Sequence, residues 1–176
     1  MAAASPAPGP ADPEPAPPES KLFAPALRDR LEEEVARAGR HGTALACLLL
    51  DVEDLREVRR AHGALLAEQA LAYVELALRA ELRRFDRVGR VGAGELLVVL
   101  PGADGPRGEV VARRLLARLR AVRLEEGGVR RPLRFAIGLA SWREGMSAAT
   151  LLAALRAAAT HPAEVDWVDE AAHPAR

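Results

Sequence analysis

The chain has 176 residues with 25 basic and 25 acidic side chains, so its formal net charge is zero. This length suits one domain with a core large enough to fold unaided, and the balanced charge gives no reason to expect nucleic acid or an anionic membrane as a partner. A single cysteine, Cys47, excludes a disulfide within the monomer, and no apolar stretch is long enough to span a membrane. Because the N-terminus also lacks a basic segment followed by a hydrophobic one, we expect a cytoplasmic protein that does not insert into membranes.

Residues 1–20 hold seven of the 13 prolines, and alanine fills most of the remainder. Such a segment cannot form a core, so it is predicted to be a disordered Pro/Ala-rich arm. The sequence leaves open whether this arm tethers the domain or has no role. The predicted domain covers residues 21–170, and residues 171–176 form a tail.

The first half of the domain alternates helical and strand patterns. Apolar residues recur at helical spacing from Pro25 until Gly39 and Gly42 end the pattern. The continuous apolar run Thr43–Val52 predicts a buried strand. A short helix over Asp54–Arg60 and a long one over Leu66–Arg83 follow. The apolar stripe of the long helix consists of Leu71, Val74, Leu78 and Leu82.

The second half begins with a β-hairpin, whose strands are predicted at Arg87–Val91 and Glu95–Leu100. After a turn at residues 101–105, a helix is predicted over Arg107–Val122, and residues 132–141 form a further strand. Ser147 is placed to cap a last helix that ends near Ala159, and Val165–Val168 is predicted to be a short final strand. The predicted helix over Arg107–Val122 carries an apolar stripe (Val110, Val111, Leu115, Leu116, Leu119) and a solvated face of four arginines (113, 114, 118, 120).

This order of elements predicts an α/β (α+β) fold with a mixed central sheet of four to five strands and helices on both faces. The hairpin tip reads Gly92-Ala93-Gly94-Glu95-Leu96, and Asp51 stands at the end of the earlier apolar run. Together with Arg90 and Asp86 at matching spacing, these residues resemble the GGDEF family, the diguanylate cyclases. The resemblance runs from about Leu27 to Ala159 and implies a domain of the nucleotidyl-cyclase type.

The resemblance also implies which residues would hold metal. Diguanylate cyclases join two GTP molecules with the help of two divalent ions. By the family pattern the first metal ligand is Asp51, with the Val52 carbonyl beside it, and the second acid of that strand is Glu53. The third signature position is an acid in the family and is Gly94 here. Glu95 remains, and the alternation of a strand places it on the face opposite to position 94.

The family's guanine-binding and phosphate-binding residues differ in this chain. Its asparagine corresponds to Arg59, which offers no acceptor, and its later aspartate corresponds to Glu68. The acid after that asparagine is Arg60, and the family's Gly-His pair is Gly63-Ala64. In the family, an Ala-Asp pair, a tyrosine and a phosphate-binding lysine and arginine occupy the segment equivalent to Leu155–Glu164. Its N-terminal turn motif corresponds to Ser20–Ala26, and neither feature is recognisable here. Catalysis is therefore not expected.

One motif of the family persists. Arg83 and Asp86 fit its Arg-x-x-Asp inhibitory site, in which the aspartate, here Asp86, stands six residues before Gly92. An arginine fork pairs with the O6 and N7 atoms of guanine, and an aspartate accepts from the guanine N–H edge, so the motif predicts binding of cyclic di-GMP. The alternative is that both residues are inherited structure, since Asp86 opens a strand and Arg83 ends a helix, where a cation is favourable without any ligand.

The remaining candidates have simpler explanations. Four histidines (His41, His62, His161, His173) are scattered without ligand spacing, which argues against a zinc site. Trp142 and Trp167 lie beside predicted strand ends, where a core edge or an interface is the simpler role.

Three functions remain open from the sequence. The first is an inactive GGDEF-like signalling module that binds cyclic di-GMP or docks a partner protein, requires no cofactor and leaves a homodimer open. The second is a divergent cyclase that uses GTP, magnesium and the acids Asp51, Glu53 and Glu95. The third is a purely structural assembly scaffold, and fold alone does not separate the three.

Overall fold

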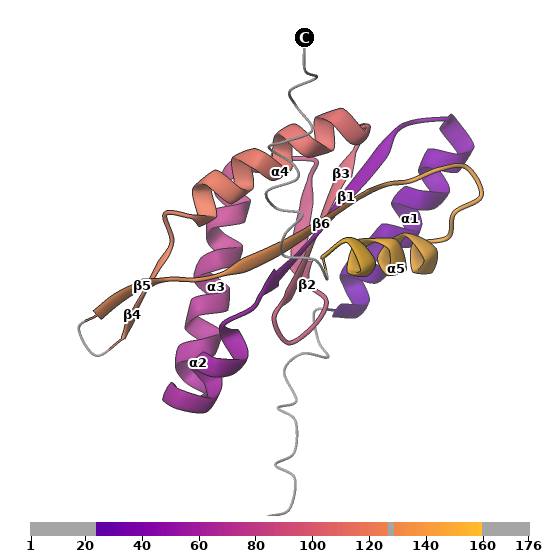
Figure 1. Cartoon of the computed structure of the whole chain (residues 1–176). Coiled ribbons are helices and arrows are strands. Elements are labelled where there is room, and N and C mark those ends of the chain that lie inside the picture. Colours follow the sequence, from indigo (N-terminus) through magenta and orange to yellow (C-terminus); the bar gives the residue numbers. More distant parts are fainter. Residues whose placement is uncertain (1–23, 127–128, 160–176) are drawn as a thin grey trace, which may run out of the picture.

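The computed structural model describes residues 24–126 and 129–159 of the chain. In this part, helices surround a four-stranded sheet, and a two-stranded hairpin stands apart from that sheet (Figure 1). The helices are α1 (Ala24–His41), α2 (Leu55–His62), α3 (Ala64–Glu81), α4 (Gly105–Leu119) and α5 (Ala148–Ala159). The strands are β1 (Leu45–Val52), β2 (Arg87–Arg90), β3 (Glu95–Pro101), β4 (Arg123–Glu126), β5 (Val129–Pro132) and β6 (Phe135–Ser141).

The central sheet has the strand order β2-β3-β1-β6, and each of its three pairings is antiparallel. The α/β class, the four central strands and the helices on both faces are confirmed, whereas the expectation of a mixed sheet is wrong. Strand β6 does run parallel to β3, as a crossover through α4 requires, but β1 lies between them. No two neighbouring strands of the described sheet are therefore parallel.

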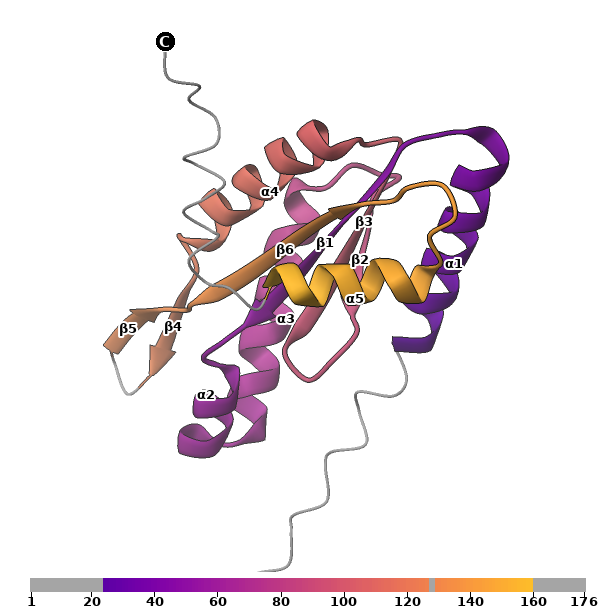
Figure 2. The ribbon, with the colours of Figure 1, turned by 45° about the vertical axis from the view of Figure 1, so that its right-hand side comes forward.

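The core has two layers, one on each side of the sheet, because successive residues of a strand point to opposite faces. Leu48 and Leu50 of β1 pack with residues of α2, α3 and α4. Cys47 and Leu49 face the other side and pack with α1 and α5. Figure 2 shows α5 crossing one face of the sheet while α3 lies behind the other. Burial raises the pKa of the Cys47 thiol to about 12, which makes it an inert core residue.

Several helix boundaries differ from the predicted ones for local reasons. Helix α1 continues through Gly39 and ends at His41, before Gly42 with its positive φ of 61°. Helix α3 ends at Glu81, so Arg83 lies beyond the helix and not at its last turn. Helix α4 begins at Gly105 because the carboxylate of Asp104 accepts the backbone N–H of Arg107 at 3.0 Å.

The exposed and buried faces of the helices follow the predicted stripes, with two exceptions on α4. Leu71, Val74 and Leu78 of α3 are buried, and Leu82 packs against them. On α4 the prediction for Val110 is wrong, since this side chain is 65% exposed and Ala112 is buried in its place. The α4 arginines at 114, 118 and 120 are exposed as expected, whereas Arg113 is half-buried beside Glu109.

The hairpin of β4 and β5 was not predicted as strands, because the sequence there reads as a polar turn. Within the central sheet the predicted strand over 132–141 is β6, which begins three residues later. The predicted Pro/Ala-rich arm, the strand at Val165–Val168 and the tail at 171–176 lie outside the described residues. Among the helices that the structure describes, none is both long and apolar enough to cross a bilayer.

An ion pair between a buried carboxylate and an exposed arginine joins the start of α2 to the segment before β6. The carboxylate of Asp54 is 6% exposed and accepts the backbone N–H of Arg134 at 2.7 Å, together with its Nε at 2.9 Å and Nη2 at 2.8 Å. Burial alone would raise the pKa of Asp54, but the hydrogen bonds and the charge of Arg134 outweigh it and hold that pKa below its ordinary value.

We expect Asp54→Asn to destabilise the fold at pH 7 by about 1–2 kcal/mol, because it replaces the charged carboxylate that accepts the hydrogen bonds of Arg134. The loss is no larger because the Arg134 side chain is 70% exposed and solvent screens its charge. A depressed carboxyl pKa contributes stability above the unfolded-state pKa of about 4, and that stability is lost as pH falls through the folded-state pKa. The difference between wild type and variant should therefore shrink below about pH 4. Urea unfolding at pH 7 and pH 3.5 measures it.

The matched control is Glu57→Gln, since Glu57 makes a 3.9 Å pair with Arg131 and is 54% exposed. Its effect should stay below about 0.5 kcal/mol at both pH values. A loss in Asp54→Asn that is equal at both pH values would contradict the assigned role of the Asp54 carboxylate.

Candidate functional site

The end of β1 and the tip of the β2–β3 hairpin form one corner of the sheet. Here Asp51 is the register partner of Glu95 on β3, and the backbone N–H of Val52 donates to the Gly94 carbonyl at 3.0 Å. A Cβ atom built at Gly94 would lie 3.3 Å from Asp51 Oδ1 and 3.5 Å from the Val52 carbonyl oxygen. The first atom of any side chain at position 94 would therefore lie next to the Asp51 carboxylate and the Val52 carbonyl, the two groups that the family resemblance assigns to metal binding.

The other two acids near this corner have different surroundings. Glu95 accepts from Nη2 of Arg156 on α5 at 3.1 Å, and its side chain folds over Gly92 at the hairpin tip. As a cross-strand neighbour of Asp51 it lies on the α5 side of the sheet. The backbone N–H of Glu53 donates to the Arg134 carbonyl, and its side chain is half-buried.

The carboxyl of Asp51 is in an unfavourable place for a negative charge. Partial burial raises its pKa, the charges of Glu95 and Glu53 raise it further, and Arg56 counteracts them only in part. A divalent cation would relieve this repulsion. However, among the described residues no group of three or more His, Cys, Asp or Glu side chains is arranged to hold a metal ion. The oxygens that the structure places at this corner are those of Asp51 and the Val52 carbonyl, with no side chain at position 94 beside them.

A chain of ion pairs involves Arg59 and Glu68, the two residues that the family resemblance assigns to guanine binding. Glu68 of α3 accepts from Arg59 of α2 at 2.8 Å through Oε1 and from Arg90 of β2 at 2.6 Å through Oε2. Arg90 also contacts Glu75 at 3.4 Å, and Glu75 pairs with Arg79 at 2.7 Å. Both carboxylate oxygens of Glu68 are thus engaged within the chain. The structure brings Arg59 and Glu68 together, but as partners of each other.

The remaining family positions are placed as follows. Arg60 is exposed on α2, and Gly63 forms the corner between α2 and α3 with φ 87°, a conformation that favours glycine. Leu155 and Arg156 lie on α5, with Leu155 buried in the core and Arg156 at the hairpin. The rest of the predicted phosphate segment beyond residue 159, and the turn motif before residue 24, lie outside the described residues.

Arg83 and Asp86 form a tight turn between α3 and β2. The carboxylate of Asp86 accepts the backbone N–H of Arg83 at 2.8 Å, and the Asp86 N–H donates to the Arg83 carbonyl at 3.1 Å. The Arg83 side chain is exposed, and within the described part of the chain no hydrogen bond or ion pair involves its guanidinium. The two residues are thus neighbours, but Asp86 opens no strand, since β2 begins at Arg87.

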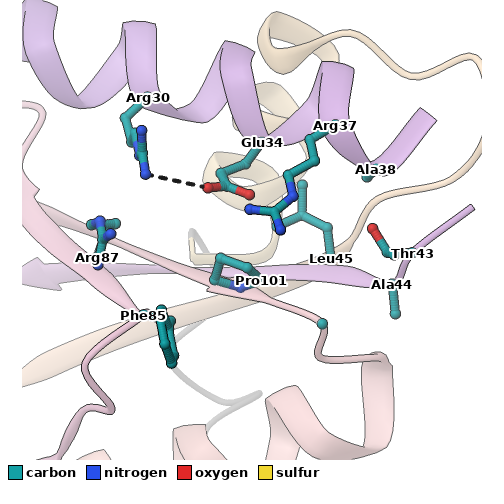
Figure 3. A pocket seen from close by; sticks show the side chains of 11 residues that line it. Arg30, Glu34, Arg37, Ala38, Thr43, Ala44, Leu45, Phe85, Arg87 and Pro101 are labelled. Atoms are coloured by element: carbon teal, nitrogen blue, oxygen red, sulfur yellow. Dashed lines mark ion pairs between the residues drawn. The ribbon is translucent and has the colours of Figure 1, made fainter. Parts of the chain in front are cut away.

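A pocket of about 400 Å³ lies next to this turn, between α1 and the ends of β1, β2 and β3. Figure 3 shows Arg30, Glu34 and Arg37 of α1 facing Phe85 and Arg87 across it. The Phe85 ring is 71% exposed, and Arg87 Nη1 donates to the carbonyls of Arg84 and Asp86. The pocket therefore combines an exposed aromatic ring with several guanidinium groups.

Sequence reasoning missed three basic partners in this region. Arg90, Arg134 and Arg156 each pair with an acid at least 15 positions away along the chain. No local spacing links such residues, so only the fold brings them together. His41 and His62 lie at the ends of α1 and α2, while His161, His173 and Trp167 fall outside the described residues. Trp142 packs at the core edge as predicted, and its Nε1 donates to the Met146 carbonyl at 2.9 Å.

Comparison with known proteins gives a consistent result. The family described as "Diguanylate cyclase, GGDEF domain" matches residues 25–161. The chain is 38% identical over 96 residues to diguanylate cyclase DgcP of Pseudomonas aeruginosa, a match that covers 54% of this chain and 14% of DgcP. It is 30% identical over 106 residues to diguanylate cyclase DosC of Escherichia coli, which covers 60% of this chain and 22% of DosC. The matched region is thus a small part of each relative.

Among solved structures, diguanylate cyclase SiaD of P. aeruginosa in complex with its activator SiaC superimposes with a TM-score of 0.75 and 25% identity. This match covers 81% of this chain and 55% of SiaD. The GGDEF domain of DgcB from Caulobacter crescentus, solved in complex with c-di-GMP, gives a TM-score of 0.74 at 17% identity over 82% of this chain and 85% of that one. At that identity the likeness to DgcB concerns the fold alone.

Proposed function

Because the chain belongs to the diguanylate cyclase GGDEF domain family, we propose that it is a catalytically inactive signalling module of that family. In this proposal its ligand is cyclic di-GMP, which binds through Arg83 and Asp86. Magnesium, which the family's chemistry uses, is not required for this role.

The observation that carries the loss of catalysis is the glycine at position 94. A Cβ atom at this position would lie next to Asp51 Oδ1 and the Val52 carbonyl oxygen. Because the residue is glycine, no side chain is present there to bind a metal ion together with those oxygens. Magnesium relies on few protein carboxylates, and the absence of one is severe for its binding. Glu95 lies on the same face of the sheet as Asp51, but its carboxylate pairs with Arg156 of α5, so a metal ion would have to displace that arginine.

The ion pairs around Glu68 support the same conclusion for GTP. A guanine that bound here would donate its N1–H and N2–H groups to a free carboxylate. Both oxygens of Glu68 already accept from Arg59 and Arg90, so guanine would have to displace a charge-assisted hydrogen bond. Arg59 itself carries only donors.

The turn at Arg83 supports the proposed ligand. Its guanidinium is exposed and without a partner among the described residues, so no internal ion pair has to break before it binds. The nearby pocket adds the Phe85 ring for base stacking and Arg37 and Arg87 for phosphate. Cyclic di-GMP combines planar guanines with two phosphates, which is the chemistry that this surface complements.

We expect isothermal titration of the protein with cyclic di-GMP to give a dissociation constant in the micromolar range, about −8 kcal/mol. Arg83→Ala should weaken binding at least about tenfold, because it removes charge-assisted hydrogen bonds worth about 1.5–3 kcal/mol. Arg84→Ala is the matched control: Arg84 is exposed in the same turn, and only its backbone carbonyl takes part in the turn contacts. Equal affinity of Arg83→Ala and Arg84→Ala for cyclic di-GMP, or no binding by the wild type, would contradict the proposal that cyclic di-GMP binds at this turn.

Incubation with GTP and Mg²⁺ or Mn²⁺ tests the inactivity separately. No cyclic di-GMP should form above the level in protein-free controls. Product that disappears in Asp51→Ala would instead identify a divergent cyclase.

A partner protein is the second candidate, and the likeness to SiaD, solved together with its activator SiaC, favours it. If cyclic di-GMP does not bind and GTP is not turned over, a stable complex with another protein is the expected activity of the domain.

A further inference from the structure

Glu34 of α1 is a buried acid that the packing of the core does not explain. Its side chain is 8% exposed, and it stands within the stripe of Leu27, Leu31 and Ala38 that packs α1 against the sheet. An apolar side chain would suit this position, because a buried carboxylate costs free energy unless charges and hydrogen bonds compensate it. Departures from the local pattern of this kind are expected at functional sites.

The compensation that Glu34 receives is incomplete. Within the described part of the chain, its carboxylate has one ion pair, with Nη2 of Arg30 at 3.7 Å, and this distance is too long for a hydrogen bond. Arg30 makes its short contact with the exposed Glu33 instead, at 2.7 Å, and its Nε is buried without a partner among the described residues. A buried acceptor and a buried donor on neighbouring side chains are thus left without hydrogen bonds.

Both side chains line the pocket of about 400 Å³ described above, which we call the Phe85 pocket after its exposed ring. Figure 3 shows Glu34 between Arg30 and Arg37, with its carboxylate directed from α1 toward the strands that form the other wall. The volume is in the range of small-molecule sites. The Phe85 pocket therefore offers a carboxylate, an arginine donor and an aromatic ring to one ligand.

Guanine carries the hydrogen-bonding groups that complement this set. Its Watson–Crick edge presents two adjacent donors, N1–H and N2–H, beside the acceptor O6. A carboxylate accepts both donors, an arginine N–H donates to O6, and an aromatic ring stacks on the base. Adenine presents the acceptor N1 where guanine has a donor, so a carboxylate in the same place would face a lone pair. The two bases are therefore distinguished by the acid.

We propose that the Phe85 pocket is a guanine subsite, in which the carboxylate of Glu34 accepts the N1–H and N2–H groups of the base and selects guanine over adenine. This placement rests on the proposed function, because the base is then the second guanine of cyclic di-GMP, whose first guanine binds Arg83 and Asp86. Phe85 stands between these two residues in the chain, so the turn and the pocket adjoin each other. Glu34 thus determines the base specificity of the site.

Isothermal titration of Glu34→Gln with cyclic di-GMP and cyclic di-AMP tests the subsite. The amide has a single acceptor, so the variant should bind cyclic di-GMP at least about tenfold more weakly and lose most of its preference over cyclic di-AMP. Glu33→Gln is the matched control: Glu33 also pairs with Arg30, but it is 64% exposed and does not line the pocket. An unchanged preference in Glu34→Gln, or equal effects of the two substitutions, would overturn the subsite and leave cyclic di-GMP binding itself intact.

Titration with GMP and AMP, followed by NMR, gives a readout that does not depend on cyclic di-GMP. GMP should shift the amide signals of Thr43 and Ala44, which line the pocket, with a dissociation constant on the order of 1 mM, and AMP should not. Phe85→Ala removes an exposed ring outside the core and should weaken GMP binding at least about fivefold.

The outcomes separate the subsite from the proposed function. Binding of GMP without binding of cyclic di-GMP would reject the proposed function and support the subsite. No shift with GMP, or equal shifts with GMP and AMP, would overturn the subsite.

Discussion

Gly138→Ala is expected to lower the free energy of unfolding by about 3 kcal/mol or more, which is a large share of the 5–15 kcal/mol that stabilises a typical domain. A Cβ atom at this position of β6 would lie 2.2 Å from the Leu155 carbonyl oxygen and 2.7 Å from the Ala159 backbone nitrogen. Both atoms belong to the backbone of α5, which cannot rotate away as a side chain does. The helix would have to lift off the sheet, and Leu151 and Leu155 would lose their core contacts.

Denaturant unfolding of wild type and variant measures this effect. Gly39→Ala is the control, because a Cβ there would meet only the Trp142 ring at 3.7 Å, an ordinary contact. As Gly39 lies inside α1, alanine should be neutral or stabilise the fold by about 0.5–1 kcal/mol. A loss below about 1 kcal/mol for Gly138→Ala would mean that α5 packs on β6 less closely than the structure indicates.

The second large effect is a gain of metal binding in Gly94→Asp. The Cβ atom of an aspartate at position 94 would lie 3.3 Å from Asp51 Oδ1 and 3.5 Å from the Val52 carbonyl oxygen. Its carboxylate would join these two groups as a third oxygen ligand for a cation. Oxygen ligands of this kind suit Mg²⁺ and Mn²⁺. Titration of the variant with Mn²⁺ should give an affinity at least tenfold higher than that of the wild type.

Without metal, the same substitution should lower the midpoint of thermal unfolding. The pKa of Asp51 is already raised by burial and by Glu95 and Glu53, and another acid beside it adds repulsion. Saturating Mn²⁺ should reverse that loss, since a ligand that binds only the folded state stabilises it. Gly94→Asn is the isosteric control and should show neither change. Equal Mn²⁺ affinity of the aspartate and asparagine variants would rule out a metal position at this corner.

The sequence was sufficient for most of the fold because its long elements have clear periodicity. The apolar run that became β1, the glycine-marked hairpin of β2 and β3, and the stripe of α3 all lie where the pattern predicted them. The β4–β5 hairpin could not be predicted in this way. Its residues are mostly charged, and among those whose burial the structure describes only Leu124 is buried in the core, so neither alternation nor an apolar run identifies it.

The candidate site was predictable only where residues lie close together in the sequence or follow a family motif. The proximity of Asp51, Val52 and Gly94 followed from the resemblance. The partners of the acids did not, because the contact of Glu95 with Arg156 spans 61 positions and that of Asp54 with Arg134 spans 80. Pairs of this separation depend on the topology, which places α5 and the segment before β6 at the same corner.

The pairing of Glu68 with both Arg59 and Arg90 has a consequence for the two substitutions that would introduce the family's residues at positions 59 and 94. Restoring an amide at position 59 removes one partner of Glu68 and leaves half of its carboxylate unpaired. Restoring an acid at position 94 crowds Asp51 with a further like charge. Each substitution alone therefore lowers the stability of the fold and provides only one of the two groups, metal ligand or guanine-binding amide. The effects of the two substitutions on function are thus not additive.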